Sequence, residues 1–381
     1  MNPRVASIAP SLIRAIHDRK RPDAIDLGLG QPTLRPDLAP LHEAMRWVEA
    51  HGCPYSPNAG FLDLRRAIAE HFRYPGLDSA DQAIITVGST EALYLAIKGL
   101  LDPGDGAGQP GDELLVVGPT FPASQKMAHM DGIQTLDVVL EAERDFIPDA
   151  DRVLAAIGPR TRLLALASPC NPTGRIWPES ELIRLADGLL RHNHPIYVLW
   201  DEVYRDLYFT PSPPPSLARF YPRTLVAGSL SKSCALTGLR LGWLLAPSEV
   251  YSVVYKAHQL TVSCAETLAQ RAALAIFKKP ELLSAHRSHY VAQQQALCVA
   301  AAELGLSIIR PEGAFYALVR LPGRWAQDSY GCAMAILDGA NVVTIPGSAF
   351  GAEGFLRLTF VPPVDQVRQG LERIAAFLAR G

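Results

Sequence analysis

One lysine in this chain has surroundings that favour covalent chemistry. Lys232 closes the segment Ser229-Leu230-Ser231-Lys232, directly after the apolar, strand-like run 224–228, and Arg240 follows eight residues later. A neighbouring cation makes a lysine amine a better nucleophile. The segment therefore predicts an amine that forms an imine with an aldehyde beside a bound anion. The structural alternative is a lysine that caps the end of a strand.

Four further polar segments follow apolar, strand-like runs. They contain, in chain order, Ser89 with Thr90, Phe121, Asn171, and Asp201 with Tyr204. The first of them is a Gly-Ser-Thr turn that opens a helical pattern. Such a turn can bind an anion through its free backbone N–H groups. Simple capping of the helix by Ser89 or Thr90 remains the alternative.

The elements that must position these residues alternate between strand and helix from about residue 83 to residue 260. Nearly continuous apolar strands separated by helices predict a three-layer α/β/α fold around a mostly parallel sheet of the seven-stranded type. Ligands of such sheets bind beyond the carboxyl ends of the strands. We therefore expect the five polar segments to meet at one edge of the sheet.

The pattern changes near residue 261, where a helical stretch over 267–304 is followed by short strands and a closing helix over 364–380. We expect three parts: an N-terminal arm with part of the small domain (1–35), a large domain (36–260) and a small α+β domain (261–381). In the last part, Arg357 alternates with apolar neighbours, which places it on the inner face of a strand. It could bind a substrate carboxylate or form a buried salt bridge.

Composition excludes several classes of protein. The chain has 381 residues, is 48% hydrophobic and has a net charge of −2, with no basic run that would favour nucleic acid or a membrane surface. Six cysteines are scattered singly, which predicts neither a metal site nor a disulfide framework. The first residues lack the long apolar segment typical of a signal peptide, and no uncharged apolar stretch reaches about 18 residues. We expect a cytoplasmic globular protein without a metal.

The polar segments together match the needs of one cofactor. Pyridoxal 5′-phosphate (PLP) requires an amine, an anion cradle, a carboxylate opposite its ring nitrogen, a stacking group and donors to its ring oxygen. The chain has a candidate for each need. Lys232 is the amine, and the 88–90 turn with Ser229 and Arg240 is the anion cradle. The carboxylate is Asp201, the stacking group is Phe121, and the donors are Asn171 and Tyr204.

The order and spacing of the motifs resemble those of a class I/II aminotransferase, in the aspartate aminotransferase superfamily of fold-type I. The resemblance extends from Gly28 to Arg357, and its most specific parts are Asn171-Pro172-Thr173-Gly174, Asp201-Glu202-Val203-Tyr204, Ser229-Leu230-Ser231-Lys232 with Arg240, and Pro346-Gly347-Ser348-Ala349-Phe350-Gly351. It implies transfer of an amino group between an L-amino acid and a 2-oxo acid through a Lys232 aldimine.

The resemblance also implies a role for each matching position. Lys232 would hold the cofactor and move the substrate proton, and Asp201 would keep the pyridine nitrogen protonated. Asn171 and Tyr204 would bond the ring oxygen. The phosphate would be held by Ser89, Thr90, Ser229 and Arg240, and Phe121 would stack on the ring. Arg357, with Gly30 and Asn171, would bind the substrate carboxylate. In a homodimer, Tyr55 would reach the phosphate bound to the partner.

Two departures and two alternatives qualify this interpretation. Thr90 stands where some aspartate-using relatives carry a lysine, which weighs against a dicarboxylate substrate, and the loop over 102–112 is longer than usual. A carbon–sulfur lyase on the same scaffold would share the proton abstraction. A non-catalytic ligand-sensing module is disfavoured because only about 25 residues precede Leu27, too few for a helix-turn-helix domain.

Overall fold

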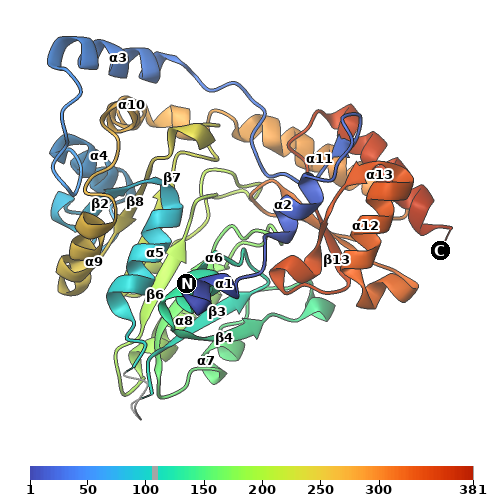
Figure 1. The fold of residues 1–381 in the computed structure, drawn as a ribbon, viewed down its shortest axis with the longest axis horizontal. Helices are drawn as coiled ribbons and strands as arrows, with labels where there is room; N and C mark the ends of the chain where they lie inside the picture. Colours follow the sequence, from blue (N-terminus) through green and yellow to red (C-terminus); the bar gives the residue numbers. More distant parts are fainter. Residues whose placement is uncertain (105–109, 381) are drawn as a thin grey trace.

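A seven-stranded sheet forms the centre of the larger part of the molecule, seen at the left of Figure 1. The computed structural model describes residues 1–104 and 110–380. In spatial order the strands are β2 (Ala83–Thr86), β8 (Gly242–Leu245), β7 (Thr224–Ser229), β6 (Tyr197–Asp201), β5 (Thr161–Ala167), β3 (Glu113–Gly118) and β4 (Gln134–Val139). β8 pairs antiparallel with both β2 and β7, and the other neighbouring strands of this sheet pair in parallel. The prediction of a mostly parallel sheet is confirmed.

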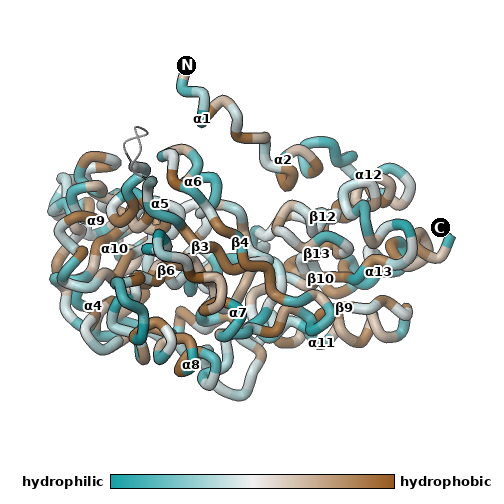
Figure 2. The backbone as a smooth tube through the Cα atoms, turned by 90° about the horizontal axis from the view of Figure 1, so that it is seen from below, coloured by the Kyte–Doolittle hydropathy of each residue, from teal (hydrophilic) through white to brown (hydrophobic). Residues whose placement is uncertain are grey.

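Helices cover both faces of this sheet because its central strands are apolar on both sides. Along β3, Leu115 and Val117 belong to one hydrophobic cluster, whereas Leu114 and Val116 belong to another. Side chains alternate across a strand, so the two clusters lie on opposite faces of the sheet. Hydrophobic segments run through the middle of this part in Figure 2. This is the three-layer α/β/α arrangement.

The surrounding helices have the bounds α3 (Ala39–His51), α4 (Leu62–Phe72), α5 (Gly88–Leu100), α6 (Ala123–Asp131), α7 (Ala150–Ala155), α8 (Glu179–Leu190), α9 (Ser248–Thr261) and α10 (Thr267–Phe277). Residues of α5 and α9 belong to one of the two clusters, and residues of α4, α8 and α10 belong to the other. The helix that begins directly after β2, α5, is the one whose first turn reaches the predicted site.

A smaller α+β part follows, as the sequence predicts. Its antiparallel sheet has the order β12 (Ile345–Pro346), β13 (Phe355–Thr359), β10 (Tyr316–Arg320) and β9 (Ile308–Ile309). Its helices are α11 (Arg287–Glu303), α12 (Ser329–Ala340) and α13 (Val364–Leu378). The N-terminal segment joins this part because β1 (Ile25–Asp26) pairs with β11 (Val342–Val343).

The N-terminal arm contains two short helices, α1 (Pro3–Ala6) and α2 (Leu12–His17), and stands out from the rest of the chain in Figure 2. The hydroxyl of Ser7 lies 2.8 Å from Nε2 of His129, on α6. The arm therefore contacts the larger part at one end, and at the other end β1 belongs to the smaller part.

Two sequence expectations for the C-terminal region need correction. The helical pattern over 267–304 forms two helices, because α10 ends at Phe277 and a 3₁₀ turn over Pro280–Ser284 precedes α11. Proline lacks a backbone N–H and disfavours helical geometry in the residue before it. Helix α12 was not predicted. Residues 105–109 of the long surface loop lie outside the described residues.

Within the described ranges, no helix is long and apolar enough to cross a membrane. The same residues contain no group of three or more histidine, cysteine or acidic side chains that could hold a metal ion.

Candidate active site

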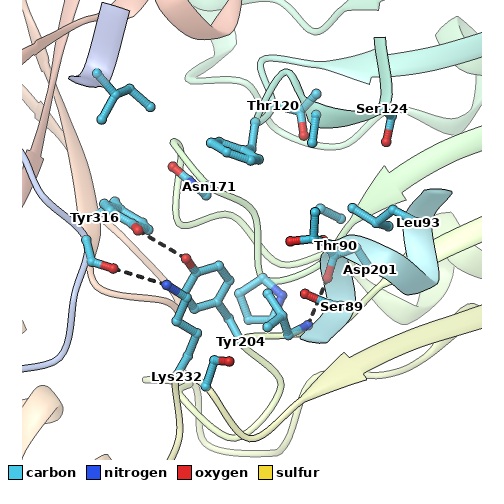
Figure 3. Close-up of a pocket in the computed structure, with 18 of the residues that line it drawn as sticks. Ser89, Thr90, Leu93, Thr120, Ser124, Asn171, Asp201, Tyr204, Lys232 and Tyr316 are labelled. Atoms are coloured by element: carbon cyan, nitrogen blue, oxygen red, sulfur yellow. Dashed lines mark hydrogen bonds between the residues drawn. The ribbon is translucent and has the colours of Figure 1, made fainter. Parts of the chain in front are cut away.

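A cavity of about 350 Å³ opens at the carboxyl ends of the parallel strands (Figure 3). Ten of the predicted site residues line it: Gly30, Ser89, Thr90, Phe121, Asn171, Asp201, Tyr204, Lys232, Arg240 and Arg357. Ser229 and Tyr55 do not line it. The loops after β2, β3, β5, β6 and β7 thus meet at one edge of the sheet, as the sequence predicts.

The amine of Lys232 points into the cavity from the turn after β7 (Figure 3). Its Nζ donates a hydrogen bond to the carbonyl oxygen of Gly30, 3.1 Å away. The same atom lies 6.0 Å from the ring centroid of Tyr204 and 5.8 Å from that of Phe315. The amine therefore faces the contents of the cavity, and the alternative of a strand-end cap is not what the structure shows.

Asp201 ends β6, and its side chain is only partly exposed to solvent. Its Oδ1 accepts a hydrogen bond from the backbone N–H of Val203 at 3.0 Å. Burial raises the pKa of the Asp201 carboxyl to about 6, and the Val203 hydrogen bond and the positive charge of Lys232 lower it in part. A buried carboxylate is best stabilised by a cationic hydrogen-bond donor. The cavity has room for such a donor.

Tyr204 lies in the turn that follows Asp201. Its hydroxyl is 3.1 Å from the hydroxyl of Tyr316 (Figure 3). Burial, followed by the neighbouring Tyr316, raises the pKa of Tyr204 well above its usual value. Tyr204 is therefore a neutral hydrogen-bond donor at physiological pH. Tyr316 comes from β10 of the smaller part, so this pair joins the two parts of the molecule at the cavity.

Arg357 lies on β13 with 2% of its surface exposed, which confirms the prediction of an inward side chain. Its Nη1 donates to Oδ1 of Asn171 at 3.1 Å, and Nη2 donates to the carbonyl oxygen of Gly28. The guanidinium carbon lies 4.4 Å from the ring centroid of Tyr316. The cation is thus held by neutral groups.

No carboxylate of the described residues lies within 4.0 Å of the Arg357 guanidinium, and its buried Nε has no hydrogen-bond partner among them. Burial accordingly lowers the pKa of Arg357. The salt bridge that the sequence left open is absent from this part of the structure. A buried arginine with a free donor is suited to an external carboxylate.

The opposite end of the cavity is formed by the first turn of α5 and by Arg240. Gly88 has a φ of +72°, and a Cβ at this position would lie 2.6 Å from Nη2 of Arg240. Only glycine allows the guanidinium to approach the helix N-terminus this closely. Nη1 of Arg240 donates to the Thr237 carbonyl oxygen at 3.0 Å. A cation beside free helical N–H groups is suited to an anion.

Ser229 lies behind this end of the cavity. Its Oγ is 2.7 Å from the carbonyl oxygen of Leu241 and 2.8 Å from Oγ of Ser231. Ser231, which the sequence analysis did not select, lines the cavity in its place.

Sequence reasoning missed several other lining residues, namely Tyr316, Thr237, Ser124 and, from the N-terminal arm, Ser11, Ile13 and Arg14. Tyr316 had a usable signal. Leu318 pairs with Arg357 across β10 and β13, and Tyr316 lies two residues before Leu318, on the same face of the sheet. The residues of the arm carry no comparable pattern.

Comparison with known proteins agrees with this geometry. The family model described as aminotransferase class I and II matches residues 22–374. The chain is 33% identical over 398 residues to the aspartate/prephenate aminotransferase of Thermus thermophilus, covering 99% of this chain and 98% of that protein. It is 31% identical over 392 residues to the probable N-acetyl-LL-diaminopimelate aminotransferase of Bacillus subtilis, covering 100% of this chain and 96% of that protein.

Solved structures show the same relationship. The structure of the aspartate aminotransferase from Thermus thermophilus with maleate has a TM-score of 0.90 and 32% sequence identity, and the match covers 99% of each chain. An aromatic aminotransferase from Pyrococcus horikoshii has a TM-score of 0.86 at 26% identity, covering 97% of this chain and 99% of that one.

The chain therefore belongs to the class I and II aminotransferase family, in the PLP-dependent fold-type I superfamily. It is an aminotransferase, which moves an amino group between an amino acid and a 2-oxo acid. Use of PLP is a general property of this family.

Proposed function

We propose that Lys232, Asp201, Asn171, Tyr204 and Arg357 form the catalytic centre of this aminotransferase. The observation that carries the proposal is their convergence on one cavity. It brings together the amine of Lys232, the carboxyl group of Asp201 and the buried guanidinium of Arg357, with which no carboxylate of the described residues pairs. These groups fit PLP and an amino acid. When bound, PLP supplies an aldehyde for attachment and a ring that accepts electrons.

Lys232 would hold the cofactor and would carry the proton that leaves and returns at the substrate Cα. Its hydrogen bond to Gly30 keeps the amine directed across the cavity. Asp201 would keep the pyridine nitrogen protonated, because a positively charged ring nitrogen would stabilise the ionised form of its carboxyl group. Tyr204 donates to the ring oxygen, and Tyr316 orients its hydroxyl. Asn171 contacts the same ring oxygen and anchors Arg357.

Arg357 binds the α-carboxylate of the substrate, with the Gly30 backbone beside it. The Asn171 amide and the Gly28 carbonyl fix the orientation of the guanidinium, and Tyr316 supports one of its faces. At the other end, Ser89, Thr90 and Arg240 would hold the phosphate, and Ser229 would act from behind the cavity wall by supporting Ser231. Phe121, which is 47% exposed, stacks on the ring.

We propose a homodimer with shared active sites. Tyr55 is 89% exposed, yet its loop is tightly held: Thr267 Oγ1 donates to the Pro54 carbonyl oxygen at 2.7 Å, and Gln270 Nε2 donates to Ser56 Oγ at 2.8 Å. An aromatic side chain presented on a fixed loop supports a contact with a second copy, whose phosphate Tyr55 would reach.

Two broader proposals accompany this one. Six free cysteines fit the reducing cytoplasm, where we place the enzyme. The division into an arm (1–35), a large domain (36–260) and a small domain (261–381) is supported by the separate sheets of the larger and smaller parts.

The central role of Lys232 is tested with the Lys232→Ala variant. We expect loss of turnover and of the visible absorbance of the bound cofactor. Lys98→Ala, which alters a surface lysine paired with Asp131, serves as the control and should behave as the wild type. Full turnover in Lys232→Ala would overturn the assignment. A screen of amino acids for single-turnover conversion of the bound cofactor identifies the amino donor.

A further inference from the structure

A buried histidine–glutamate pair lies directly behind the phosphate end of the cavity, and the proposed chemistry does not use it. Nδ1 of His258, on α9, is 2.7 Å from Oε1 of Glu91, in the first turn of α5. The two side chains are 0% and 6% exposed, respectively. Neither residue lines the cavity. Burying two ionisable groups is costly unless their hydrogen bonds are satisfied.

The hydrogen bonds of the pair require a proton between Nδ1 and Oε1. Nε2 of His258 lies 2.8 Å from the carbonyl oxygen of Asn58, and a carbonyl only accepts, so Nε2 carries a hydrogen. If Glu91 were a carboxylate and Nδ1 had no hydrogen, two lone pairs would face each other at 2.7 Å. The pair therefore consists of an imidazolium with a carboxylate, or of an imidazole with a carboxylic acid.

The other oxygen of Glu91 extends this connection to the cradle. Oε2 accepts a hydrogen bond from the backbone N–H of Val87 at 2.6 Å. Val87 immediately precedes Gly88, whose lack of a Cβ lets Arg240 approach, and Ser89 and Thr90 follow. Glu91 thus fixes the backbone at the turn that presents the phosphate donors.

The histidine extends the connection in the opposite direction, to the loop that carries Tyr55. Asn58, whose carbonyl oxygen accepts from His258, is three residues from Tyr55. Its side chain is also held, since Nδ2 donates to the carbonyl oxygen of Ser263 at 2.7 Å. One continuous set of hydrogen bonds therefore runs from Val87 through Glu91 and His258 to the 54–61 loop.

We propose that Glu91 and His258 are positioning residues for the cofactor phosphate, holding the first turn of α5 and the Tyr55 loop in a fixed mutual arrangement. This rests on the proposed binding of PLP with its phosphate at Ser89 and Arg240. Hydrogen bonds weaken steeply with misalignment, so a relaxed turn would lose affinity for the phosphate specifically. The ring and the aldehyde, bound at Asp201 and Lys232, would be unaffected.

The test compares the binding of two aldehydes to the apoenzyme: PLP, and pyridoxal, which lacks the phosphate. In Glu91→Ala we expect PLP affinity to fall about tenfold or more while pyridoxal affinity changes less than about twofold. Glu91→Gln should stay within about threefold of the wild type, because its amide oxygen can accept from Val87 and its NH₂ can donate to a neutral His258. Rescue by glutamine is an outcome that a general loss of packing would not produce.

His258→Leu is the second variant, because it removes the link to Asn58 and leaves Glu91 in place. We expect PLP affinity to fall about three- to tenfold, again without an equal effect on pyridoxal. Thr224→Val is the control. It removes a buried hydrogen bond, from Thr224 Oγ1 to the Tyr221 carbonyl oxygen at 2.7 Å, at the start of β7, away from the cavity.

Three results would overturn the positioning role: equal losses for PLP and pyridoxal, a Glu91→Gln variant as weak as Glu91→Ala, or unchanged PLP affinity in both Glu91→Ala and His258→Leu. A wild-type enzyme that binds PLP no more tightly than pyridoxal would instead contradict the proposed phosphate site itself. The two failures are therefore distinguishable.

Discussion

The two ends of the cavity each present an arginine, and the two arginines are held in opposite ways. Arg240, at the phosphate end, is exposed, has a φ of +52° and lies against the glycine that opens α5. Arg357, at the carboxylate end, is almost fully buried on a strand of the smaller sheet. Water can stabilise the first cation in the absence of a ligand, whereas the second depends on Asn171, Gly28 and Tyr316.

This difference fits the lifetimes of the two ligands. A cofactor that stays bound can be held by many modest contacts, including helix N–H groups and an exposed cation. A substrate that comes and goes must be recognised quickly and in one orientation, which a preorganised, desolvated arginine achieves at a cost in stability. The comparison predicts that changes at the two ends affect different measurements.

The largest effect is expected from Arg357→Met. Removing the buried partner of a carboxylate costs several kcal/mol, so kcat/KM for amino acids should fall about 10²- to 10³-fold. PLP affinity should stay near that of the wild type. Steady-state kinetics and cofactor titration of the same preparation check both statements.

Arg320→Met is a suitable control for this substitution. Arg320 lies on the neighbouring strand β10, stacks 4.7 Å from the centroid of the Phe355 ring and does not line the cavity. Its kcat/KM should match that of the wild type. If Arg357→Met kept its kcat/KM, the substrate carboxylate would have to bind elsewhere.

Arg240→Met should produce the complementary result. Loss of a charged hydrogen-bond donor to the phosphate should weaken PLP binding about 10- to 100-fold. With PLP at saturating concentration, the KM for the amino acid should change little. Arg223→Met, at a partly exposed arginine paired with Glu249, controls for the loss of a surface charge. A large change in KM at unchanged PLP affinity would mean that the two ends are wrongly assigned.

Asp201→Asn tests the cost of the buried carboxylate. The pKa of Asp201 is raised from 3.8 to about 6 in the folded apoenzyme, chiefly by burial. Between these values the folded state binds more protons than the unfolded state, so the contribution of this site to stability falls as pH rises. Above pH 6, apo Asp201→Asn should therefore be more stable than the wild type by on the order of 2 kcal/mol, and the gain should vanish near pH 4.

Denaturant unfolding of both apoenzymes between pH 4 and pH 8 measures this difference. If the free energies of unfolding of the two apoenzymes differed by the same amount at every pH, burial of the Asp201 carboxylate would not lower the stability of the wild type. The asparagine variant should also lose most of its activity, because a neutral amide cannot keep the pyridine nitrogen protonated.

Much of this site could be predicted from the sequence because it follows the ends of parallel strands. Asp201 comes directly after an apolar run, and Asn171 and Lys232 follow shortly after two others. The carboxyl ends of those strands share one edge of the sheet. Arg357 was predictable from its alternation with apolar neighbours. The two-helix structure of 267–304 could have been inferred from Pro280.

The rest depends on packing between elements far apart in the chain. Glu91 and His258 are 167 residues apart, and neither has a local pattern that predicts the other. The sequence pointed to Ser229, but Ser231 lines the cavity. Which of the two serines reaches the cavity wall depends on the path of the turn after β7. The arm residues Ile13 and Arg14 line the cavity in an arm that is held at one end by the pairing of β1 with β11 and at the other by the contact of Ser7 with His129.

The central claim is that Lys232 is the residue that holds the cofactor. Borohydride reduction of the PLP-loaded enzyme, followed by digestion and mass mapping, tests it most directly. We predict a single phosphopyridoxyl group, on the peptide that contains Lys232, and none in Lys232→Ala treated in the same way. A phosphopyridoxyl group on a different lysine of the active wild-type enzyme would contradict the account.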